Sequence, residues 1–169
     1  MIKGGIFMTD YDKAEAVLTE QLGHNVVFAL ATSADDIPTA RNINGYYKDG
    51  AIYITSHTAS IKMQQIAKNP RAGLCRGVEQ QVPVTDAESL FQAWGDAENL
   101  GHPLEPQNKA LRDELRQVFI QFYDAHVNEK DEGTCLLKIQ LTGAVLFDGE
   151  HKYIVRFADK NAEVTPFKM

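Results

Sequence analysis

Five residues in the first half of the chain have side chains suited to holding one anionic group: Arg41, Thr55, Ser56, Ser60 and Lys62. Arginine offers a planar fork of N–H donors, lysine a point charge, and the hydroxyls further donors. Four of the five lie where a predicted strand leads into a predicted helix. Free backbone N–H groups and the positive end of the helix dipole would face the same point. This spacing predicts a small anion site, suited to a phosphate.

A simpler interpretation stays open for part of this set. Ser60 could be an ordinary helix N-cap and Lys62 a solvated helix residue. Arg41 is more informative, because it lies in a largely apolar predicted strand with no obvious acidic partner nearby. His57 lies in the same region, where it could contact a ligand or be an ordinary loop histidine.

The charge of the chain is unevenly distributed. The net charge is −6, which argues against general nucleic-acid binding. The stretch from Arg41 to Arg76 nevertheless holds six basic residues and one acid. Such a basic island favours a small anionic ligand held locally, although ordinary clustering of solvated charge gives the same composition.

Length and composition indicate an ordinary globular protein. The 169 residues, 44% of them hydrophobic, suit a single domain with a sizeable core. No apolar run approaches the roughly 20 residues that a membrane span needs, and the first residues do not read as an export signal, so we expect a cytoplasmic protein. Cys75 and Cys135 are expected to be small buried thiols rather than a disulfide. The absence of a Cys/His cluster predicts no metal site.

Hydrophobic patterning predicts a mainly β fold with some α. The expected strands cover residues 25–32, 37–47, 51–55, 71–77, 89–98, 134–141, 144–147 and 153–157. The expected helices cover residues 9–22, 60–69 and 106–127. Tight turns between short strands indicate an antiparallel barrel of about seven or eight strands, with two or three helices outside it. Segment 80–86 is expected to be a loop or an edge, and the tail 159–169 to be polar and peripheral.

Several residues define these elements more closely. Thr9 is expected to cap the first helix, and Asp49-Gly50 to form a hairpin turn. The strand 25–32 is almost continuously apolar and should be buried on both faces. Thr142-Gly143 is expected to separate two strands, and Trp94 to lie in the barrel core.

Two predictions concern the surroundings of the anion site. Alternation along the strand 37–47 puts Thr39, Arg41 and Ile43 on one face. In the helix that follows, periodicity puts four polar residues largely on its outer faces. These four are Lys62, Gln64, Gln65 and Lys68.

The order and spacing of several short sequence segments resemble those of the pyridoxamine 5′-phosphate oxidase-like FMN-binding split barrels. The resemblance runs from about residue 26 to 98 and is weaker over the C-terminal strands. The segments that carry it are PTARNI (38–43), IYITS (52–56), SIK (60–62), QI (65–66), NPR (69–71) and WGDAE (94–98).

The resemblance implies one domain over residues 1–169: a six-stranded split barrel that dimerises, with FMN at each end of the dimer interface. The cofactor-binding residues that it implies are Arg41, Asn42, Ile43, Thr55, Ser56, Ser60, Lys62 and Gln92. Among them, Arg41 and Lys62 would contact the phosphate with help from Ser60. The strand from Arg41 to Ile43 would face the isoalloxazine ring, and Thr55 and Ser56 would line the phosphate and ribityl side. Gln92 would be lent to the flavin by the partner subunit.

The sequence also departs from the oxidases of this family. They usually have arginine where this chain has Ile61, and they carry a C-terminal tryptophan and a basic segment for the vitamin B6 phosphate. The one tryptophan here is Trp94. Vitamin B6 oxidation is therefore not expected. Residues of about 104–128 are a helical insertion relative to the minimal barrel.

The resemblance therefore favours an FMN-dependent oxidoreductase with an unknown substrate, for which an electron donor such as NAD(P)H is possible. No catalytic residue can be named. One alternative is a non-catalytic FMN-binding stress or redox-sensing protein. A more distant alternative is a barrel that holds haem or a deazaflavin, because the contact missing at Ile61 leaves room for a different ligand.

Overall fold

The computed structural model describes residues 7–76 and 90–168, which form eight strands and four α-helices. The strands are β1 (Val26–Ala34), β2 (Ile37–Lys48), β3 (Ala51–His57), β4 (Arg71–Arg76), β5 (Gln92–Gly101), β6 (Thr134–Phe147), β7 (His151–Arg156) and β8 (Asn161–Pro166). The helices are α1 (Asp10–Leu22), α2 (Ile61–Lys68), α3 (Lys109–Val118) and α4 (Ile120–His126), with a 3₁₀ turn η2 (Pro106–Asn108) before α3.

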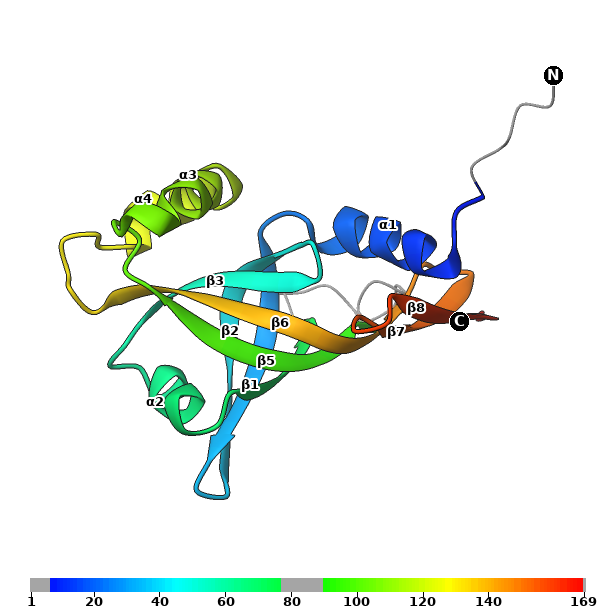
Figure 1. Ribbon diagram of the computed structural model, residues 1–169, viewed down its shortest axis with the longest axis horizontal. Helices are drawn as coiled ribbons and strands as arrows, with labels where there is room; N and C mark the ends of the chain where they lie inside the picture. Colours follow the sequence, from blue (N-terminus) through cyan, green and yellow to red (C-terminus); the bar gives the residue numbers. More distant parts are fainter. Residues whose placement is uncertain (1–6, 77–89, 169) are drawn as a thin grey trace.

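Six of the strands close into an antiparallel barrel. Their order is β3-β2-β1-β4-β5-β6, and β6 returns to pair with β3, while β7 and β8 extend the sheet beyond β6. Helix α1 and the α3–α4 pair lie on one side of the sheet, and α2 lies on the other (Figure 1). The predicted fold class, a mainly β split barrel with peripheral helices, is confirmed.

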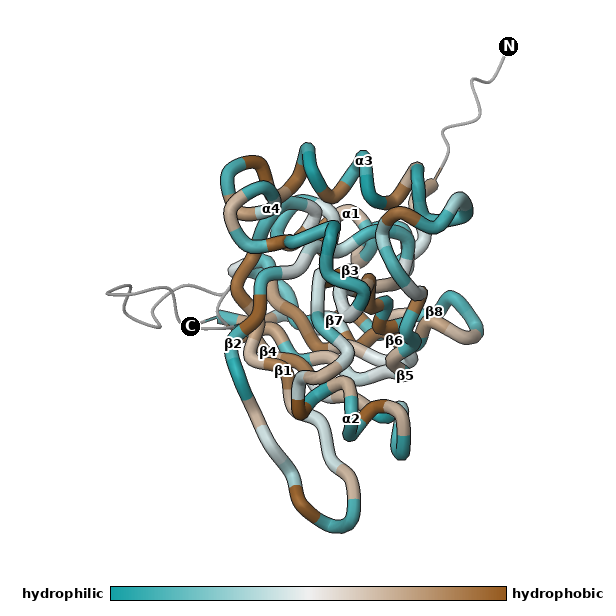
Figure 2. Tube along the Cα trace, turned by 90° about the vertical axis from the view of Figure 1, so that its left-hand side faces the viewer, coloured by the Kyte–Doolittle hydropathy of each residue, from teal (hydrophilic) through white to brown (hydrophobic). Residues whose placement is uncertain are grey.

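The barrel is open between β2 and β3. These strands pair only next to their turn, at Tyr46–Tyr53, Tyr47–Ile52 and Lys48–Ala51. Asp49 and Gly50 have φ angles of 49° and 77°, so the turn is the tight hairpin predicted from their sequence. Beyond the turn, β2 leaves β3 and stays paired with β1, and the long β1–β2 hairpin projects from the body of the molecule (Figures 1 and 2). The first half of β2 and the last residues of β3 therefore face a gap in the barrel wall.

The apolar residues form two cores. The larger fills the barrel and continues under α1 and α2, where Leu18 and Met63 join strand residues such as Phe28 and Ile52. The smaller lies outside the barrel, where Leu115, Phe119 and Tyr123 of the α3–α4 pair cover Tyr46 and Leu136. Figure 2 shows hydrophobic segments concentrated in the strands, with hydrophilic ones interrupting the outer helices. No helix in the described parts of the chain has the length and apolar character needed to cross a membrane.

The helix predicted over 106–127 is interrupted. It begins as the 3₁₀ turn η2 and then divides into α3 and α4 at Phe119, whose φ and ψ are −94° and 21°. The Phe119 ring is buried edge-on against Tyr46 and also contacts Phe122. This anchor holds the chain to the sheet at the point where the helix axis changes, which periodicity alone did not predict.

The separation of two strands at Thr142-Gly143 was wrong, because β6 is continuous through both residues. Gly143 serves packing: a Cβ there would lie 2.4 Å from the Trp94 ring. A register shift between Trp94 and Gly95 in β5 accommodates this contact. The prediction that Trp94 lies in the barrel core was wrong as well. Its ring packs over Gly143 on the outside of the barrel and is 47% exposed.

The C-terminal tail is peripheral, as predicted, because it lies at the outer edge of the sheet, but it forms a strand that the sequence analysis missed. Residues 161–166 form β8, which pairs with β7 in a register from His151–Pro166 to Arg156–Asn161. Ala162 and Val164 on alternate positions pack against the main core. The other face of β8 is exposed and carries polar residues, so the tail is polar in composition. Two alternating apolar residues are too few to predict a strand from the sequence.

Smaller corrections concern the other strands. β1 alternates between more and less buried residues, with Ala31 exposed, so it is not buried on both faces. β4 ends at Arg76 and β5 begins at Gln92; Gly77, Ser89 and segment 80–86 lie outside the described residues. Both cysteines are free, but Cys75 is exposed and only Cys135 is buried.

The N-terminus of α1 gives a test of the fold. The Thr9 hydroxyl accepts from the Asp12 N–H while the Asp12 carboxylate accepts from the Thr9 N–H, which is a complete capping box. Replacing Thr9 by Ala should cost about 1 kcal/mol and lower the melting temperature by roughly 2–4 °C. Thr19→Ala, on the exposed face of the same helix, is the control in thermal denaturation. Equal melting temperatures for the two variants would contradict the role given to this cap.

Candidate anion-binding site

Arg41 is held by three neutral acceptors. Its Nη1 donates to the Leu30 carbonyl at 3.2 Å and to the Thr32 hydroxyl at 2.8 Å, and its Nη2 donates to the Thr39 hydroxyl. A guanidinium has five N–H donors, so two remain without an acceptor among the described residues. Partial burial lowers the pKa of Arg41. The guanidinium is therefore fixed in direction, but its charge is not neutralised.

Lys62 brings a second positive charge to the same place. It is half-buried in the first turn of α2, and burial, followed by repulsion from Arg41, lowers its pKa. Neither Arg41 nor Lys62 has a carboxylate partner in the parts of the chain that the structure describes. Two partly desolvated cations without a counter-ion are costly unless an anion joins them. This pair fits a bound anion.

Two buried serine hydroxyls at this site lack a strong hydrogen-bond partner. Among the described residues, the buried Ser60 Oγ has no hydrogen-bond partner, and the buried Ser56 Oγ has only a contact with the Cys135 thiol, which helps to lower the pKa of that thiol. Ser60 is the N-cap residue of α2, yet its side chain makes no cap hydrogen bond. Buried hydroxyls are nearly always paired, so the Ser60 hydroxyl is available to donate to a bound group, and Ser56 has no stronger acceptor than a thiol. The interpretation of Ser60 as an ordinary cap is therefore not supported by its contacts.

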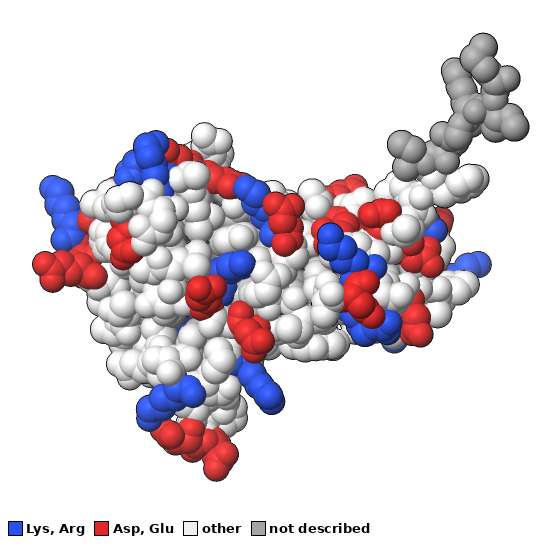
Figure 3. Space-filling model, viewed as in Figure 1, with Lys and Arg blue, Asp and Glu red and all other residues white. Residues whose placement is uncertain are grey.

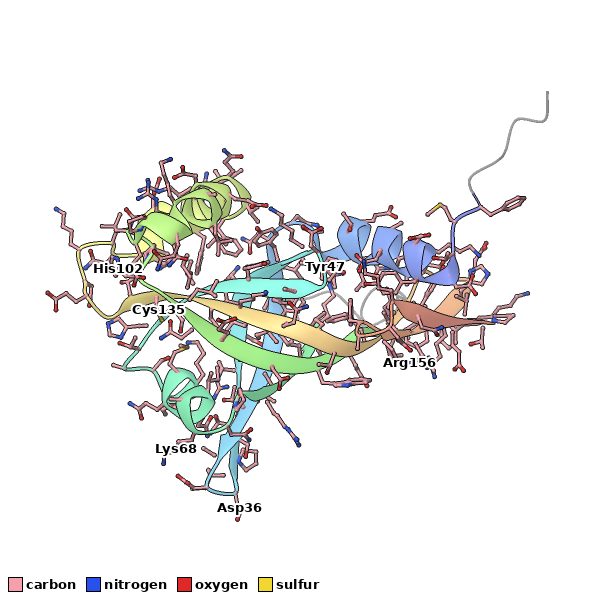
Figure 4. The ribbon with its side chains drawn as sticks, in the orientation of Figure 1. Asp36, Tyr47, Lys68, His102, Cys135 and Arg156 are labelled. Atoms are coloured by element: carbon pink, nitrogen blue, oxygen red, sulfur yellow. The ribbon has the colours of Figure 1, made fainter. Side chains whose placement is uncertain are left out.

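Cys135 lies at the same place. It pairs with Ser56 across β3 and β6, and in Figure 4 it marks the start of β6, between α2 and the α3–α4 pair. Burial raises the pKa of its thiol, and the charge of Lys62 partly offsets that effect. Nothing in the sequence linked Cys135, far along the chain, to the segment 55–62.

Gln65 is the main residue that the sequence analysis misplaced. It was expected on an outer face of the helix, but it is only 8% exposed. Its Oε1 accepts from both the Thr32 and Thr39 hydroxyls at 2.6 Å, and these hydroxyls in turn accept from Arg41. Strand alternation had put the polar Thr39 on the face of Arg41, but nothing in the helical periodicity linked Gln65 to that face.

The other predicted residues are distributed around this group. Asn42 is exposed, on the opposite face of β2 from Arg41, and Ile43 packs against the main core. Thr55 lines a cleft of about 280 Å³ beside α4, together with Ser56 and His57. His57 has structural partners: its Nδ1 accepts from the Ala59 N–H at 3.1 Å, and its Nε2 lies 3.2 Å from an Asp131 carboxylate oxygen.

Gln92 does not join the group within one chain. It pairs with Val145 near the far end of β6, whereas Ser56 pairs with Cys135 near its beginning. Ten strand residues separate these positions, a length of up to about 33 Å at 3.3 Å per residue.

The site's charge is not part of a wide basic surface. On the face shown in Figure 3, lysine and arginine side chains lie among acidic ones, with no broad patch of one sign. Two of the basic residues in the stretch 41–76 are neutralised by ion pairs, Lys68 with Asp35 and Lys48 with Glu114. Arg41 and Lys62 are partly buried cations without a carboxylate partner among the described residues, which suits a small anion better than a polyanion. The described residues also contain no group of His, Cys, Asp or Glu able to hold a metal ion.

Comparison with known sequences gives one informative match. A curated pyridoxine/pyridoxamine 5′-phosphate oxidase from Bradyrhizobium sp. (strain ORS 278) is 36% identical over 88 residues, which are 45% of this chain and 40% of that enzyme. The match therefore spans less than half the length of the curated relative. No family model matches the chain.

Solved structures match over most of the chain. General Stress Protein 26 from Bacillus anthracis str. Sterne has a TM-score of 0.58 at 17% identity and covers 85% of this chain and 98% of its own. An FAD-binding protein from Mesorhizobium loti has a TM-score of 0.58 at 20% identity, with coverages of 78% and 89%. A heme-binding protein from Mycobacterium smegmatis has a TM-score of 0.63 at 13% identity, with coverages of 96% and 60%.

At these identities the structural matches concern the fold alone. Together with the sequence match they confirm the predicted resemblance to pyridoxamine 5′-phosphate oxidase-like proteins, and the structural matches show that the chain shares their split-barrel fold. Proteins with this fold include flavin binders and haem binders, so the ligand has to be argued from this chain's own residues.

The uncompensated charge at Lys62 predicts a gain in stability when it is removed. Because the pKa of Lys62 is lowered in the folded protein, its charge opposes folding at neutral pH, and this penalty disappears as pH rises from the lowered pKa towards the ordinary lysine value. Lys62→Met should therefore raise the melting temperature of the ligand-free protein at pH 7 by on the order of 1–3 °C.

Lys68→Met is the matched control, since Lys68 is an exposed lysine of the same helix that pairs with Asp35. The advantage of Lys62→Met over wild type should shrink as pH rises towards the ordinary pKa of lysine. A Lys62→Met protein that melts below wild type at pH 7 would show that Lys62 already has a stabilising partner.

Proposed function

We propose that the chain binds FMN, with its phosphate at the group formed by Arg41, Lys62, Ser56 and Ser60, and acts as an FMN-dependent oxidoreductase. The observation that carries this proposal is a pair of partly buried cations with no carboxylate partner among the described residues, next to a buried serine hydroxyl, Ser60, that has no partner there and a second, Ser56, that contacts only a thiol. The site lies at the N-terminus of an eight-residue helix, whose first N–H groups have no acceptor within the helix.

The charge of the site matches a phosphomonoester. Such a group carries about −1.5 to −2 charges at pH 7, which two cations can balance. The phosphates of a dinucleotide such as FAD are diesters, with about one charge each. The relative in Mesorhizobium loti is named as FAD-binding, which supports a flavin as the ligand. The two phosphates of FAD together carry about the same charge as the FMN phosphate, but a phosphomonoester concentrates it on one group, which suits two cations at one point.

The bound flavin would supply the electron transfer, and the chain would bind it, orient it and exclude water from one side. The side chains that surround the proposed phosphate are cations, hydroxyls and a thiol whose pKa is raised by burial. No catalytic residue is assigned among them, so the contribution that we propose for this chain is binding. A nicotinamide donor such as NAD(P)H is the proposed source of electrons. Oxidation of vitamin B6 phosphates is not proposed, because the chain lacks the tryptophan and the basic segment described above.

Two other functions share the fold. A non-catalytic FMN-binding stress or redox-sensing protein fits the same phosphate site, and one structural neighbour is named as a general stress protein. Haem binding is suggested by the name of another neighbour. It fits this site less well, because both ring nitrogens of the nearby His57 already have partners.

The visible spectrum of the purified protein tests the proposal. Wild-type protein mixed with FMN should retain it through gel filtration and absorb near the flavin maxima. Arg41→Ala should weaken FMN binding by about 1.5–3 kcal/mol, because a hydrogen bond to a charged group is lost, which is roughly 10- to 150-fold in Kd.

Arg71→Ala, a change at an exposed arginine of β4, is the control and should leave the Kd unchanged. Equal FMN affinities for Arg41→Ala and wild type would refute the phosphate site. Flavin that is bound but never reduced by NADH or NADPH would favour the sensor, and a Soret band without flavin uptake would favour haem.

We further propose that the protein is a homodimer in which Gln92 of one chain reaches the flavin held by the other. The position of Gln92, at the opposite end of β6 from Ser56, supports a contribution from a second copy only. Light scattering should give twice the mass of the chain, and Gln92→Ala should weaken FMN binding without changing that mass. A monomeric protein that still retains FMN through gel filtration would contradict the proposed dimer.

A further inference from the structure

We propose that Gln65 is the positioning residue of the phosphate site: it fixes Arg41 through two threonine hydroxyls and leaves the arginine's charge available to the ligand. This inference rests on the proposed function. It concerns a residue that does not itself contact the ligand and that lies on a different element from Arg41.

The direction of each hydrogen bond around Gln65 follows from the count of available protons. Thr32 and Thr39 each have one hydroxyl proton, and both hydroxyls lie 2.6 Å from Gln65 Oε1, which can only accept. With their protons committed to Gln65, both oxygens must turn their lone pairs elsewhere. Arg41 uses them, through Nη1 at Thr32 and Nη2 at Thr39.

The orientation of the Gln65 amide is fixed as well. Its Nε2 donates to the Ile37 carbonyl at 2.9 Å. Rotating the amide by 180° would set its oxygen against that carbonyl oxygen and remove the acceptor shared by the two hydroxyls. Gln65 is 8% exposed and Thr32 is 3% exposed, so water cannot readily replace these bonds. The network therefore has one arrangement of protons, and that arrangement points acceptors at Arg41.

The neutrality of the network matters as much as its geometry. A glutamate at position 65 has nearly the same shape and could also accept from both threonines. It would, however, put a negative charge next to Arg41 and satisfy the cation internally. Glutamine supplies the acceptor without the charge, so Arg41 keeps its attraction for an external anion.

Gln65 also ties the two cations together. It lies one turn after Lys62 in α2, whereas Arg41 lies on β2 and Thr32 on β1. The Gln65 side chain thereby fixes the helix that carries one cation against the strands that carry the other. This bridge, from α2 to β1 and β2, therefore helps to set the separation of the two charges.

Gln65→Met and Gln65→Glu separate positioning from simple packing. We expect FMN affinity to fall about tenfold in Gln65→Met, where the hydrogen bonds are lost, and about 100-fold in Gln65→Glu, where the charge of Arg41 is neutralised. Riboflavin lacks the phosphate, so its affinity should be the same in all three proteins. A purely structural role predicts the reverse order, because glutamate keeps the shape and the acceptors, and it predicts parallel losses for riboflavin.

Two further variants make the test independent of folding defects. Gln64→Glu places the same charge on an exposed neighbour in α2 and should leave FMN affinity within about twofold of wild type. Thr39→Val removes one of the two relayed contacts and should lower FMN affinity by several-fold, with riboflavin again unchanged. Circular dichroism establishes that each variant is folded before it is titrated.

Inorganic phosphate serves as a probe that does not depend on the flavin. Its affinity, measured by ³¹P line broadening, should fall in both Gln65 variants and most in Gln65→Glu. Unchanged affinities for FMN and phosphate in these variants would overturn the positioning role while leaving the phosphate site intact. A wild-type protein that prefers neither FMN over riboflavin nor phosphate over chloride would overturn the proposed function, and the positioning role with it.

Discussion

An unbalanced pair of positive charges is the constraint around which this structure is arranged. Arg41 and Lys62 are partly withdrawn from water, repel each other, and have no carboxylate among the residues that the structure describes. Such a pair persists only where the surrounding structure holds it. Here the arginine is held by neutral oxygens and the lysine by a helix that is itself tied to the strands. The opening between β2 and β3 gives this pair access to a ligand, because a fully paired barrel wall would cover it.

The rest of the molecule is built to keep that opening fixed. At the other end of β2, the Tyr47 hydroxyl donates to Glu15 of α1 at 2.6 Å and accepts from the Gly50 N–H at 3.0 Å. This contact fixes the hairpin turn against the first helix, so β2 and β3 diverge from a rigid point. On the other side, the Thr58 N–H donates to the Gly133 carbonyl at 2.8 Å. A side chain at Gly133 would lie 2.3 Å from the His57 ring. The turn that carries Ser60 is thereby attached to the start of β6.

The sequence was sufficient for the features that depend on local rules. Capping at Thr9, the Asp49-Gly50 hairpin and the alternation that puts Thr39 with Arg41 each follow from neighbouring residues, and all are present. Features that depend on contacts across the fold were missed. Gly143 was taken for a turn because its partner, the Trp94 ring, is 49 residues away in the chain. β8 was missed because its burial depends on the core that it joins.

The same division explains the candidate site. Arg41, Ser60 and Lys62 could be singled out by type and spacing, and the fold brings them together. Gln65 was missed, because helical periodicity alone grouped it with the polar Lys62, Gln64 and Lys68 on the outer faces of the helix. Its burial follows from three polar partners on other elements: Thr32, Thr39 and the Ile37 carbonyl. A buried polar network is specified by the assembled structure, and a sequence read one element at a time does not reveal it.

The central claim is that this chain holds a phosphomonoester as a dianion between two cations. The most direct measurement is the ³¹P NMR spectrum of FMN bound to the wild-type protein, recorded as pH is lowered from 8 to 5. The account predicts a bound resonance, shifted from that of free FMN, that stays at the position of the dianion below pH 6, where free phosphomonoesters begin to take up a proton. A resonance that keeps the position and the titration of free FMN would contradict it.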